Sequence, residues 1–199
     1  DGRTITVRLQ PGIFFADDPA FKGRKRELVA QDYVYAIKRF YDPQYNSSDL
    51  YLFETAKLLG LSAVRERSVK TRQPFDYDAE VEGLKTLDRY TFRLVLGEAN
   101  PRFVYLLADP AIAGAVAREV VEFYGKDIGA HPVGTGAFRL KSWRRASRIV
   151  LERNPGYRRV VYDGTPAGAG PDAPLAQGIG RSLAGRALPL VDEVQVDIV

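Results

Sequence analysis

The sequence contains no cysteine, no methionine and a single histidine among its 199 residues. The absence of cysteine excludes disulfides, thiolate chemistry and cysteine-ligated zinc, and it is compatible with an oxidising compartment. The one histidine, His131, precedes Pro132 and has no accompanying motif that would build a metal site or activate a nucleophile. The sequence therefore predicts no catalytic residues, no metal site and no cofactor.

Long apolar runs and an initiator methionine are also missing. No stretch approaches the ~18 apolar residues that a membrane-spanning helix needs, and no signal peptide is recognisable. The chain opens at Asp1 and runs almost directly into an alternating strand pattern. We therefore expect it to be a piece of a longer protein whose export signal lies elsewhere.

Neither sign of charge dominates the sequence. The 29 lysines and arginines are nearly balanced by 25 aspartates and glutamates, which leaves a net charge of +4. This balance favours a solvated surface of mixed charge over a nucleic-acid-binding face. With 45% hydrophobic residues, the chain is long enough to bury a sizeable core in one large domain or two small ones.

Strand and helix patterns both occur in the first half of the chain. Residues 4–9 and 90–96 alternate between apolar and other side chains, which predicts half-buried strands. Between them, apolar residues recur at the helical period over 30–41, which predicts an amphipathic helix. The residues that form this stripe are Tyr33, Ala36, Ile37 and Phe40.

The two ends of the predicted helix carry different signals. Lys38 and Arg39 lie near the C-terminal end, where the helix dipole favours cations. At the other end, Val29 occupies the capping position, and its side chain cannot accept a hydrogen bond. We therefore expect Asp32 to reach back and cap the helix.

Residues 45–51 combine two tyrosines with small polar residues. Tyr45 and Tyr51 offer apolar area with a hydrogen-bonding tip, and Asp49 lies between them. Two interpretations remain open: the tyrosines form one wall of a ligand-binding site, or they cap the edge of the core. Composition alone favours the second interpretation.

Residues 163–189 are rich in glycine, alanine and proline and poor in large apolar side chains. Such a segment buries too little apolar surface to order itself, so we expect a flexible, extended surface loop. Alternation returns over 190–199 and predicts a final strand.

The most specific stretch is a glycine-rich turn followed by two short strands. Glycines flank the threonine of Gly134-Thr135-Gly136, where they allow positive φ or a close approach of another segment. Residues 138–143 and 148–153 predict a β-hairpin, and Asn154-Pro155-Gly156 is turn sequence that ends the second strand.

This stretch carries a family resemblance. The string HPVGTGAFRLKSW at 131–143, followed by RIVLERNPGY at 148–157, resembles the signature of family 5 extracellular solute-binding proteins. Segments at 1–15, 30–43 and 83–96 are similar to that family as well. A motif of this length and spacing is far more specific than a glycine-rich turn alone.

The resemblance implies an α+β fold, mixed α/β in composition, of the periplasmic-binding-protein class II type. It implies that the chain holds part of the first lobe of a two-lobed protein. Residues 1–129 then form a peripheral subdomain, and residues 130–199 form part of the central sheet, with the flexible loop at 163–189. Since the opposite lobe is absent, we expect the chain alone to bind peptide weakly or not at all.

The resemblance also implies a function. Family members are monomeric, non-enzymatic substrate-binding components of ABC importers, periplasmic or held outside the cell by a lipid anchor. Their partners are peptides, oligopeptides or other small solutes and the permease subunits in the membrane, with no nucleic acid. Two alternatives stay open: a receptor for a nickel complex, haem or a sugar, and a hydrolase that uses Asp17, Asp18 or His131.

Site residues follow from the same resemblance. In oligopeptide-binding relatives, the loop that matches residues 45–51 presents a tyrosine to the peptide. The residues implied to bind ligand are Tyr45, Asp49, Tyr51 and Thr135, and those implied to shape the loop are Gly134 and Gly136.

Overall fold

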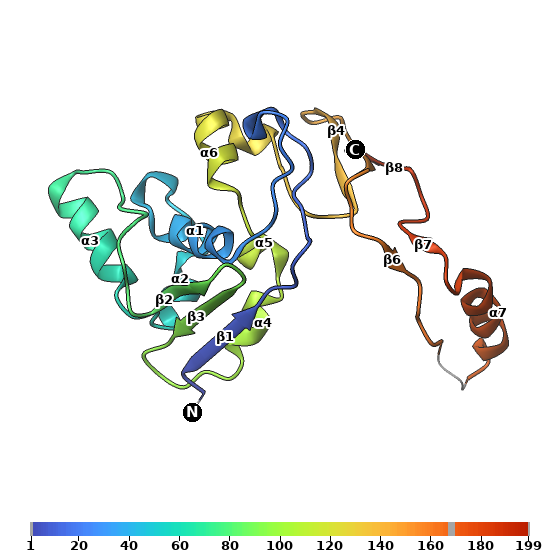
Figure 1. The fold of residues 1–199 in the computed structure, drawn as a ribbon, viewed down its shortest axis with the longest axis horizontal. Coiled ribbons are helices and arrows are strands. Elements are labelled where there is room, and N and C mark those ends of the chain that lie inside the picture. The colour runs from blue at the N-terminus through green and yellow to red at the C-terminus, as the bar shows by residue number, and fades with distance from the viewer. Residues whose placement is uncertain (1, 167–169, 199) are drawn as a thin grey trace.

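The computed structural model describes residues 2–166 and 170–198 (Figure 1). The helices are α1 (Ala30–Tyr41), α2 (Leu50–Thr55), α3 (Leu61–Thr71), α4 (Phe103–Leu107), α5 (Pro110–Ala113), α6 (Arg118–Tyr124) and α7 (Ala173–Leu183). The strands are β1 (Thr4–Arg8), β2 (Leu84–Asp88), β3 (Thr91–Val95), β4 (Phe138–Arg144), β5 (Arg148–Arg153), β6 (Val160–Val161), β7 (Ala187–Leu188) and β8 (Glu193–Asp197). The mixed α/β composition predicted from the sequence is confirmed.

All strand pairs in the described residues are antiparallel. One sheet has the order β1-β3-β2, a second has the order β4-β5-β8, and β6 pairs with β7 as a two-stranded ribbon. The alternating patterns at 4–9 and 90–96 correspond to β1 and β3, which are direct neighbours. The sequence prediction of strands in these two places is confirmed.

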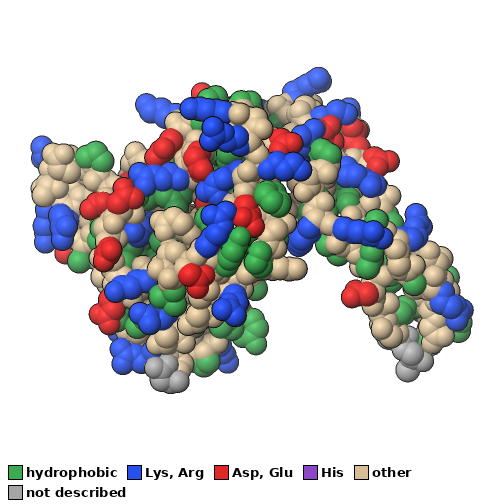
Figure 2. Space-filling model, in the orientation of Figure 1, with side chains coloured by type: hydrophobic (Ala, Val, Ile, Leu, Met, Phe, Trp, Pro, Cys, Tyr) green, Lys and Arg blue, Asp and Glu red, His purple; other side chains and the backbone are tan. Residues whose placement is uncertain are grey.

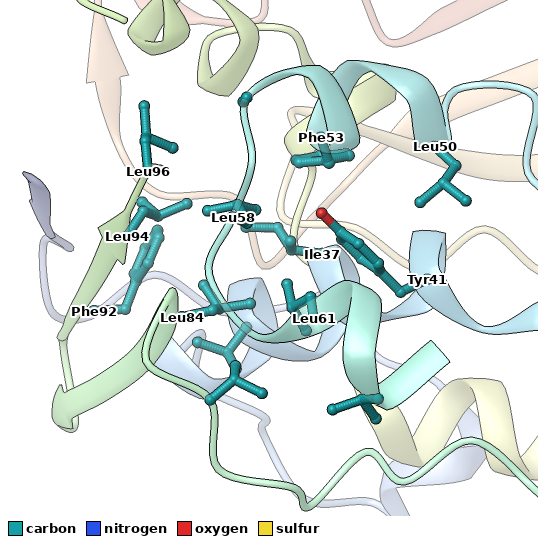
Figure 3. Close-up of a cluster of buried hydrophobic side chains, with 14 of the residues drawn as sticks. Ile37, Tyr41, Leu50, Phe53, Leu58, Leu61, Leu84, Phe92, Leu94 and Leu96 are labelled. Carbon is teal, nitrogen blue, oxygen red and sulfur yellow. The ribbon is translucent and has the colours of Figure 1, made fainter. Parts of the chain in front are cut away.

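The main core fills the space between the first sheet and helices α1 to α3 (Figure 3). The inward face of β3 and the residue after it are nearly inaccessible: Phe92 is 1% exposed, and Leu94 and Leu96 are 0% exposed. The opposite wall comes from the helices and the segment between them, and its residues are Ile37, Tyr41, Leu50, Phe53, Leu58 and Leu61.

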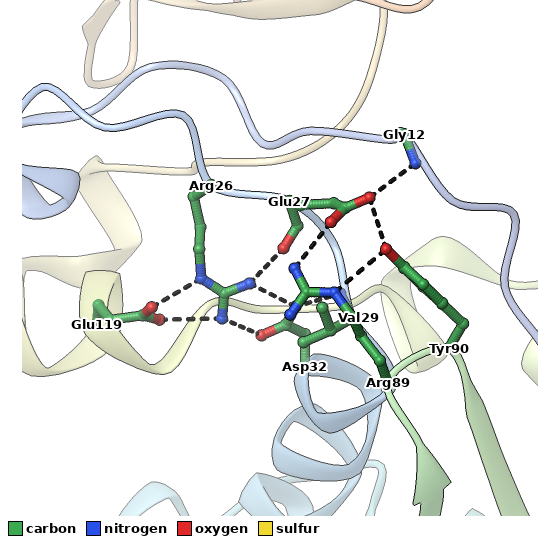
Figure 4. A network of polar contacts seen from close by, with 8 residues as sticks. All are labelled: Gly12, Arg26, Glu27, Val29, Asp32, Arg89, Tyr90 and Glu119. Atoms are coloured by element: carbon green, nitrogen blue, oxygen red, sulfur yellow. Dashed lines mark hydrogen bonds and ion pairs between the residues drawn. The ribbon is translucent and has the colours of Figure 1, made fainter.

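Helix α1 is capped by its own third residue, as the sequence predicts. The Asp32 carboxylate accepts the backbone N–H of Val29 at 2.8 Å, and it also accepts two bonds from Arg26 at 2.7 and 3.1 Å (Figure 4). Arg26 further donates to Glu119 on α6 at 2.7 Å. This arrangement joins the segment before α1 to both helices.

Burial is the largest single influence on the pKa values of Asp32 and Arg26 in this network. Burial raises the pKa of Asp32, and the hydrogen bonds from Arg26 and Val29 oppose that rise. For Arg26, burial lowers the pKa, but the bonds to Glu119 and Asp32 outweigh it and raise the pKa. The pKa of Asp32 is raised overall, because burial outweighs the three N–H donors that its carboxylate accepts.

The second sheet is built on the predicted hairpin. Strands β4 and β5 pair from Phe138 opposite Arg153 to Arg144 opposite Arg148, with an irregularity between Leu140 and Ser142. Ion pairs link the strands of this sheet: Arg139–Glu152 joins β4 to β5 at 2.7 Å, and Arg148–Asp197 joins β5 to β8 at 2.6 Å. Lys141–Glu193, at 2.7 Å, joins the two outer strands β4 and β8. At exposed positions each such pair contributes about 0.2–1 kcal/mol, so these pairs add little to the stability of the sheet.

The prediction of an extended loop over 163–189 is wrong. Residues 167–169 lie outside the described part, but α7 and β7 both form within the remainder. Leu175 and Ile179 are spaced at i and i+4 along α7, a helical period that the glycine-rich composition conceals. Gly180 of α7 permits a close approach, since a Cβ there would lie 2.5 Å from Pro166.

Buried side chains concentrate in the first two thirds of the chain. Both hydrophobic clusters have their buried members between Phe15 and Val120. After residue 137, only Asn154 and Gly180 are buried among the described residues. This distribution supports a division into subdomains at 129/130, which stays a prediction. On the face shown in Figure 2, basic and acidic side chains are interspersed, as the composition predicts.

Candidate functional site

A recess of about 540 Å³ opens between the C-terminal half of α1, the loop that follows it, and the segment around α5. Pockets that hold small ligands measure roughly 300–1,000 Å³, so this recess has the size of a binding site. Its walls mix polar and apolar groups. One side is lined by Arg39, Phe40, Tyr45, Asn46, Ser47 and Ser48, and the other by Pro110, Ala111, Ile112, Gly114, Ala115 and Val116.

Arg39 and Tyr45 form the most distinctive pair in the recess. The guanidinium carbon of Arg39 lies 4.5 Å from the centroid of the Tyr45 ring, a cation–π geometry that holds both side chains in place. The Nε of Arg39 is buried and has no hydrogen-bond partner among the described residues. A buried donor without an acceptor is costly, and the ring of Tyr45 is the only cation–π partner of the Arg39 guanidinium among the described residues.

Local capping places Tyr45 on the recess wall. The Asp42 carboxylate accepts the backbone N–H of Gln44 at 2.9 Å and starts a short 3-10 turn over Pro43–Tyr45. Its second oxygen accepts the hydroxyl of Tyr77 at 2.7 Å, which anchors the turn to the body of the protein. Asn46 then takes a left-handed conformation with φ of 43° and redirects the chain.

The facing wall is built by the same kind of cap. The Asp109 carboxylate accepts the backbone N–H of Ala111 at 2.9 Å, and Pro110 stands in the first turn of α5. The order Asp109-Pro110, a capping residue followed by proline, is the signal that predicts a helix start there.

The structure places one of the four predicted ligand-binding residues in this recess. Tyr45 lines it, whereas Asp49, Tyr51 and Thr135 are not among its lining residues. Asp49 precedes α2 and contacts its neighbours, accepting the Ser48 hydroxyl at 3.4 Å, and Tyr51 is 60% exposed. Arg39 was interpreted from the sequence only as a cation at a helix end, because spacing alone does not show which surface a side chain faces.

The Gly134-Thr135-Gly136 turn is tied to two distant segments. The carbonyl of Gly134 accepts the N–H of Ala16 at 2.8 Å, and the carbonyl of Gly136 accepts the Asn154 side-chain amide at 2.9 Å. Neither glycine has positive φ, and a Cβ at Gly134 would meet nothing within 4 Å. The described residues therefore show why this turn is anchored, but not a need for glycine at position 134.

Two of the three groups considered for hydrolysis, Asp18 and His131, have structural partners, and Asp17 is exposed. Asp18 accepts the backbone N–H of Ala20 at 2.9 Å and the hydroxyl of Tyr124 at 3.0 Å. The ring of His131 stacks on Tyr124 with centroids 3.8 Å apart and planes 4° from parallel. Within the described ranges, no hydrogen bond joins His131 to a carboxylate, so no acid–base pair is assembled.

No group of three or more potential metal-ligating side chains from histidine, cysteine, aspartate and glutamate occurs in the part of the chain that the structure covers. Over the same residues, none of the helices combines the length and apolar character required to cross a membrane.

Comparison with known proteins places the chain in context. It is 33% identical over 133 residues to the periplasmic oligopeptide-binding protein OppA of Salmonella typhimurium, covering 65% of this chain and 23% of OppA. It is 36% identical over 157 residues to the glutathione-binding protein GsiB of Salmonella paratyphi A, covering 79% of this chain and 24% of GsiB. These relatives are solute-binding proteins and not enzymes.

Solved structures show the same fold. A crystal structure of a periplasmic oligopeptide-binding protein (OppAIV) from Borrelia burgdorferi superposes with a TM-score of 0.67 at 18% identity, over 100% of this chain and 32% of that one. The chain thus spans about a quarter of the length of the curated relatives cited above. The model of bacterial extracellular solute-binding proteins, family 5 Middle, matches residues 1–199. The chain belongs to the family 5 bacterial extracellular solute-binding proteins.

Proposed function

We propose that the protein to which this chain belongs is the substrate-binding component of an ABC importer. It captures peptides or oligopeptides in a cleft between two lobes and delivers them to a membrane permease. It acts as a monomer, in the periplasm or anchored outside the cell, and has no nucleic-acid partner. Family membership supports the receptor class, and the names of OppA and GsiB support a peptide-like ligand.

The recess that bears Arg39 and Tyr45 carries this proposal. A peptide offers a carbonyl at every residue, and the guanidinium of Arg39, which lines the recess, is a donor group suited to such an acceptor. Tyr45 adds a flat apolar surface with a polar tip, a combination that holds side chains of varied shape. The polar side chains of Asn46 and Ser48 widen the set of peptides that the wall accommodates.

Asp49, Tyr51 and Thr135 stay proposed ligand contacts of the complete protein. Each is at least partly accessible in the described chain. Gly134 and Gly136 stay proposed as the residues that shape the turn around Thr135. No observation favours a nickel complex, haem or a sugar over a peptide.

The test begins with mass spectrometry of the ligand that co-purifies with the complete protein, and a peptide is the expected finding. That peptide is then titrated by calorimetry into the wild type and into Tyr45→Ala. We expect Tyr45→Ala to weaken binding at least about fivefold, because an aromatic contact contributes about 1 kcal/mol beyond its area. Tyr105→Ala, at a 75% exposed position outside the recess, is the matched control and should leave affinity unchanged.

Two results would contradict the proposal. A co-purified ligand without peptide bonds would rule out peptide capture as the main activity. Equal affinities of the wild type and Tyr45→Ala for the identified peptide would show that this recess takes no part in binding.

A further inference from the structure

A second recess, of about 280 Å³, lies between α1, the segment 77–81 and the start of β2. It is separate from the recess at Arg39: the neighbouring residues Lys38 and Arg39 line different cavities. Its lining is largely polar, with side chains of both charges. Nothing in the proposed peptide-capture function uses it.

Lys38 is the unusual group in this second recess. It is only 5% exposed, yet it forms no salt bridge with a carboxylate among the described residues. Its ammonium donates to the carbonyls of Tyr77 at 2.7 Å and Ala79 at 2.8 Å. An ammonium has three N–H donors, so these bonds leave one.

The pKa of Lys38 also indicates that its ammonium lacks a full counter-charge. Burial lowers its pKa, and the charges of Asp78, Asp76 and Glu80 oppose this only in part. Two neutral carbonyls stabilise a buried cation less than a direct carboxylate partner does. A ligand carboxylate that accepts the remaining N–H of Lys38 would therefore supply the direct negative partner that the described residues do not provide.

The rim of the recess offers the opposite charge. Glu80 is exposed and has no ion-pair partner among the described residues, whereas the nearby Asp78 is paired with Arg118 at 2.8 Å. One end is held by Gln31, whose side-chain oxygen accepts the Thr86 hydroxyl at 2.8 Å. The recess thus places a buried cation and a free carboxylate around one small volume.

We propose that this second recess binds a free α-amino acid in its zwitterionic form. The ligand carboxylate accepts the third N–H of Lys38, and the ligand ammonium donates to Glu80. The volume of about 280 Å³ lies below the roughly 300–1,000 Å³ of pockets for drug-sized ligands, so it restricts the ligand to a small side chain. The inference does not rest on peptide capture at the first recess.

The test is a titration of the isotope-labelled full chain, followed by amide NMR. L-alanine is the probe, and propionate and ethylamine each lack one of its two charges. We expect L-alanine to shift the amides of Gln31, Lys38, Glu80 and Lys85 saturably and to bind more tightly than either half-ligand. Shifts confined to Asn46 and Ser48 would place the amino acid in the first recess and overturn the inference.

Variants separate the two contacts. Glu80→Gln should weaken L-alanine about tenfold, since it replaces a charge-assisted bond by a neutral one, and it should leave propionate unchanged. Glu82→Gln, an exposed change two residues away and outside the recess, is the matched control. Lys38→Met should abolish binding of L-alanine and propionate. If Lys38→Met does not fold, Glu80→Gln still decides.

Absence of saturable shifts at the four amides overturns the inference. So does equal affinity of the wild type for L-alanine and propionate, because a zwitterion site requires both ends to contribute.

Discussion

Replacing Asp32 by alanine tests the polar network that joins α1 to its surroundings (Figure 4). Asp32 is 2% exposed, and its carboxylate accepts the Val29 N–H and both bonds from Arg26. The alanine variant therefore removes the cap of α1 and one of the two carboxylate partners of Arg26. The remaining partner, Glu119, is 46% exposed in its side chain and stays in place.

The expected loss of stability combines two effects. Removing a helix cap costs about 0.5–2 kcal/mol, and removing one partner of a buried ion pair costs about 3–5 kcal/mol. The side chain of Arg26 is 23% exposed and keeps Glu119, so the ion-pair cost falls at or below the low end of its range. We expect the free energy of unfolding to fall by about 3 kcal/mol in total.

Urea denaturation followed by circular dichroism measures this change from the shift in midpoint at constant slope. Glu119→Ala is the matched comparison, and it should cost less than about 1 kcal/mol because Glu119 is largely solvated. Adding Arg26→Met to Asp32→Ala should recover stability, since the partly buried cation that lost its buried partner is then removed. A double variant no more stable than Asp32→Ala would refute the reasoning that the charge of Arg26, left with only its exposed partner, carries the cost.

Three further outcomes follow from the structure. Phe53→Ala should lower the free energy of unfolding by about 3–5 kcal/mol in the same denaturation assay, since Phe53 is 0% exposed in the core. Gly83→Ala should destabilise the fold by about 1–3 kcal/mol or more, because the added Cβ would lie 2.2 Å from the backbone nitrogen of Leu59. Gly129→Ala is the control and should be tolerated, because a Cβ at Gly129 would have no atom within 4 Å. The pKa of Glu27 is lowered from its ordinary value of 4.5, first by the hydrogen bond from Arg89. The charged Glu27 therefore stabilises the fold above pH 4.5, and this contribution is lost as the pH falls through the lower pKa of the folded state. The melting temperatures of the wild type and Glu27→Gln should converge on acidification, and a difference that persists in acid would contradict this.

Local periodicity predicted the elements whose contacts are close in sequence. The spacing of Tyr33, Ala36 and Ile37 predicts α1, and Asp32 caps it as expected, because a cap reaches only three residues. The alternation over 138–153 likewise predicts the hairpin, since its strands are joined by a short turn. For these elements the determining interactions lie within one window of sequence.

The site and the last third of the chain depend on longer range. Arg39 lines the recess because the loop at Tyr45 and the segment at Ala111 lie on its other sides. Helical spacing in the sequence predicts neither of these arrangements. Helix α7 was missed because composition was weighed before period, although Leu175 and Ile179 carry the period. Composition indicates how much apolar surface a segment can bury, whereas the spacing of its apolar residues indicates whether it forms a helix or a strand.

Asn154 shows how a local interpretation can be correct and incomplete. Its side-chain oxygen accepts the Gly156 N–H at 3.0 Å, which is the turn predicted from the sequence. The same side chain donates to the carbonyl of Gly136, and its backbone N–H donates to the carbonyl of Ala137, both at 2.9 Å. Asn154 is 3% exposed in a hairpin that is otherwise accessible. A buried amide with all these bonds satisfied fixes the glycine turn to the end of β5, so the two halves of the family motif form one structural unit.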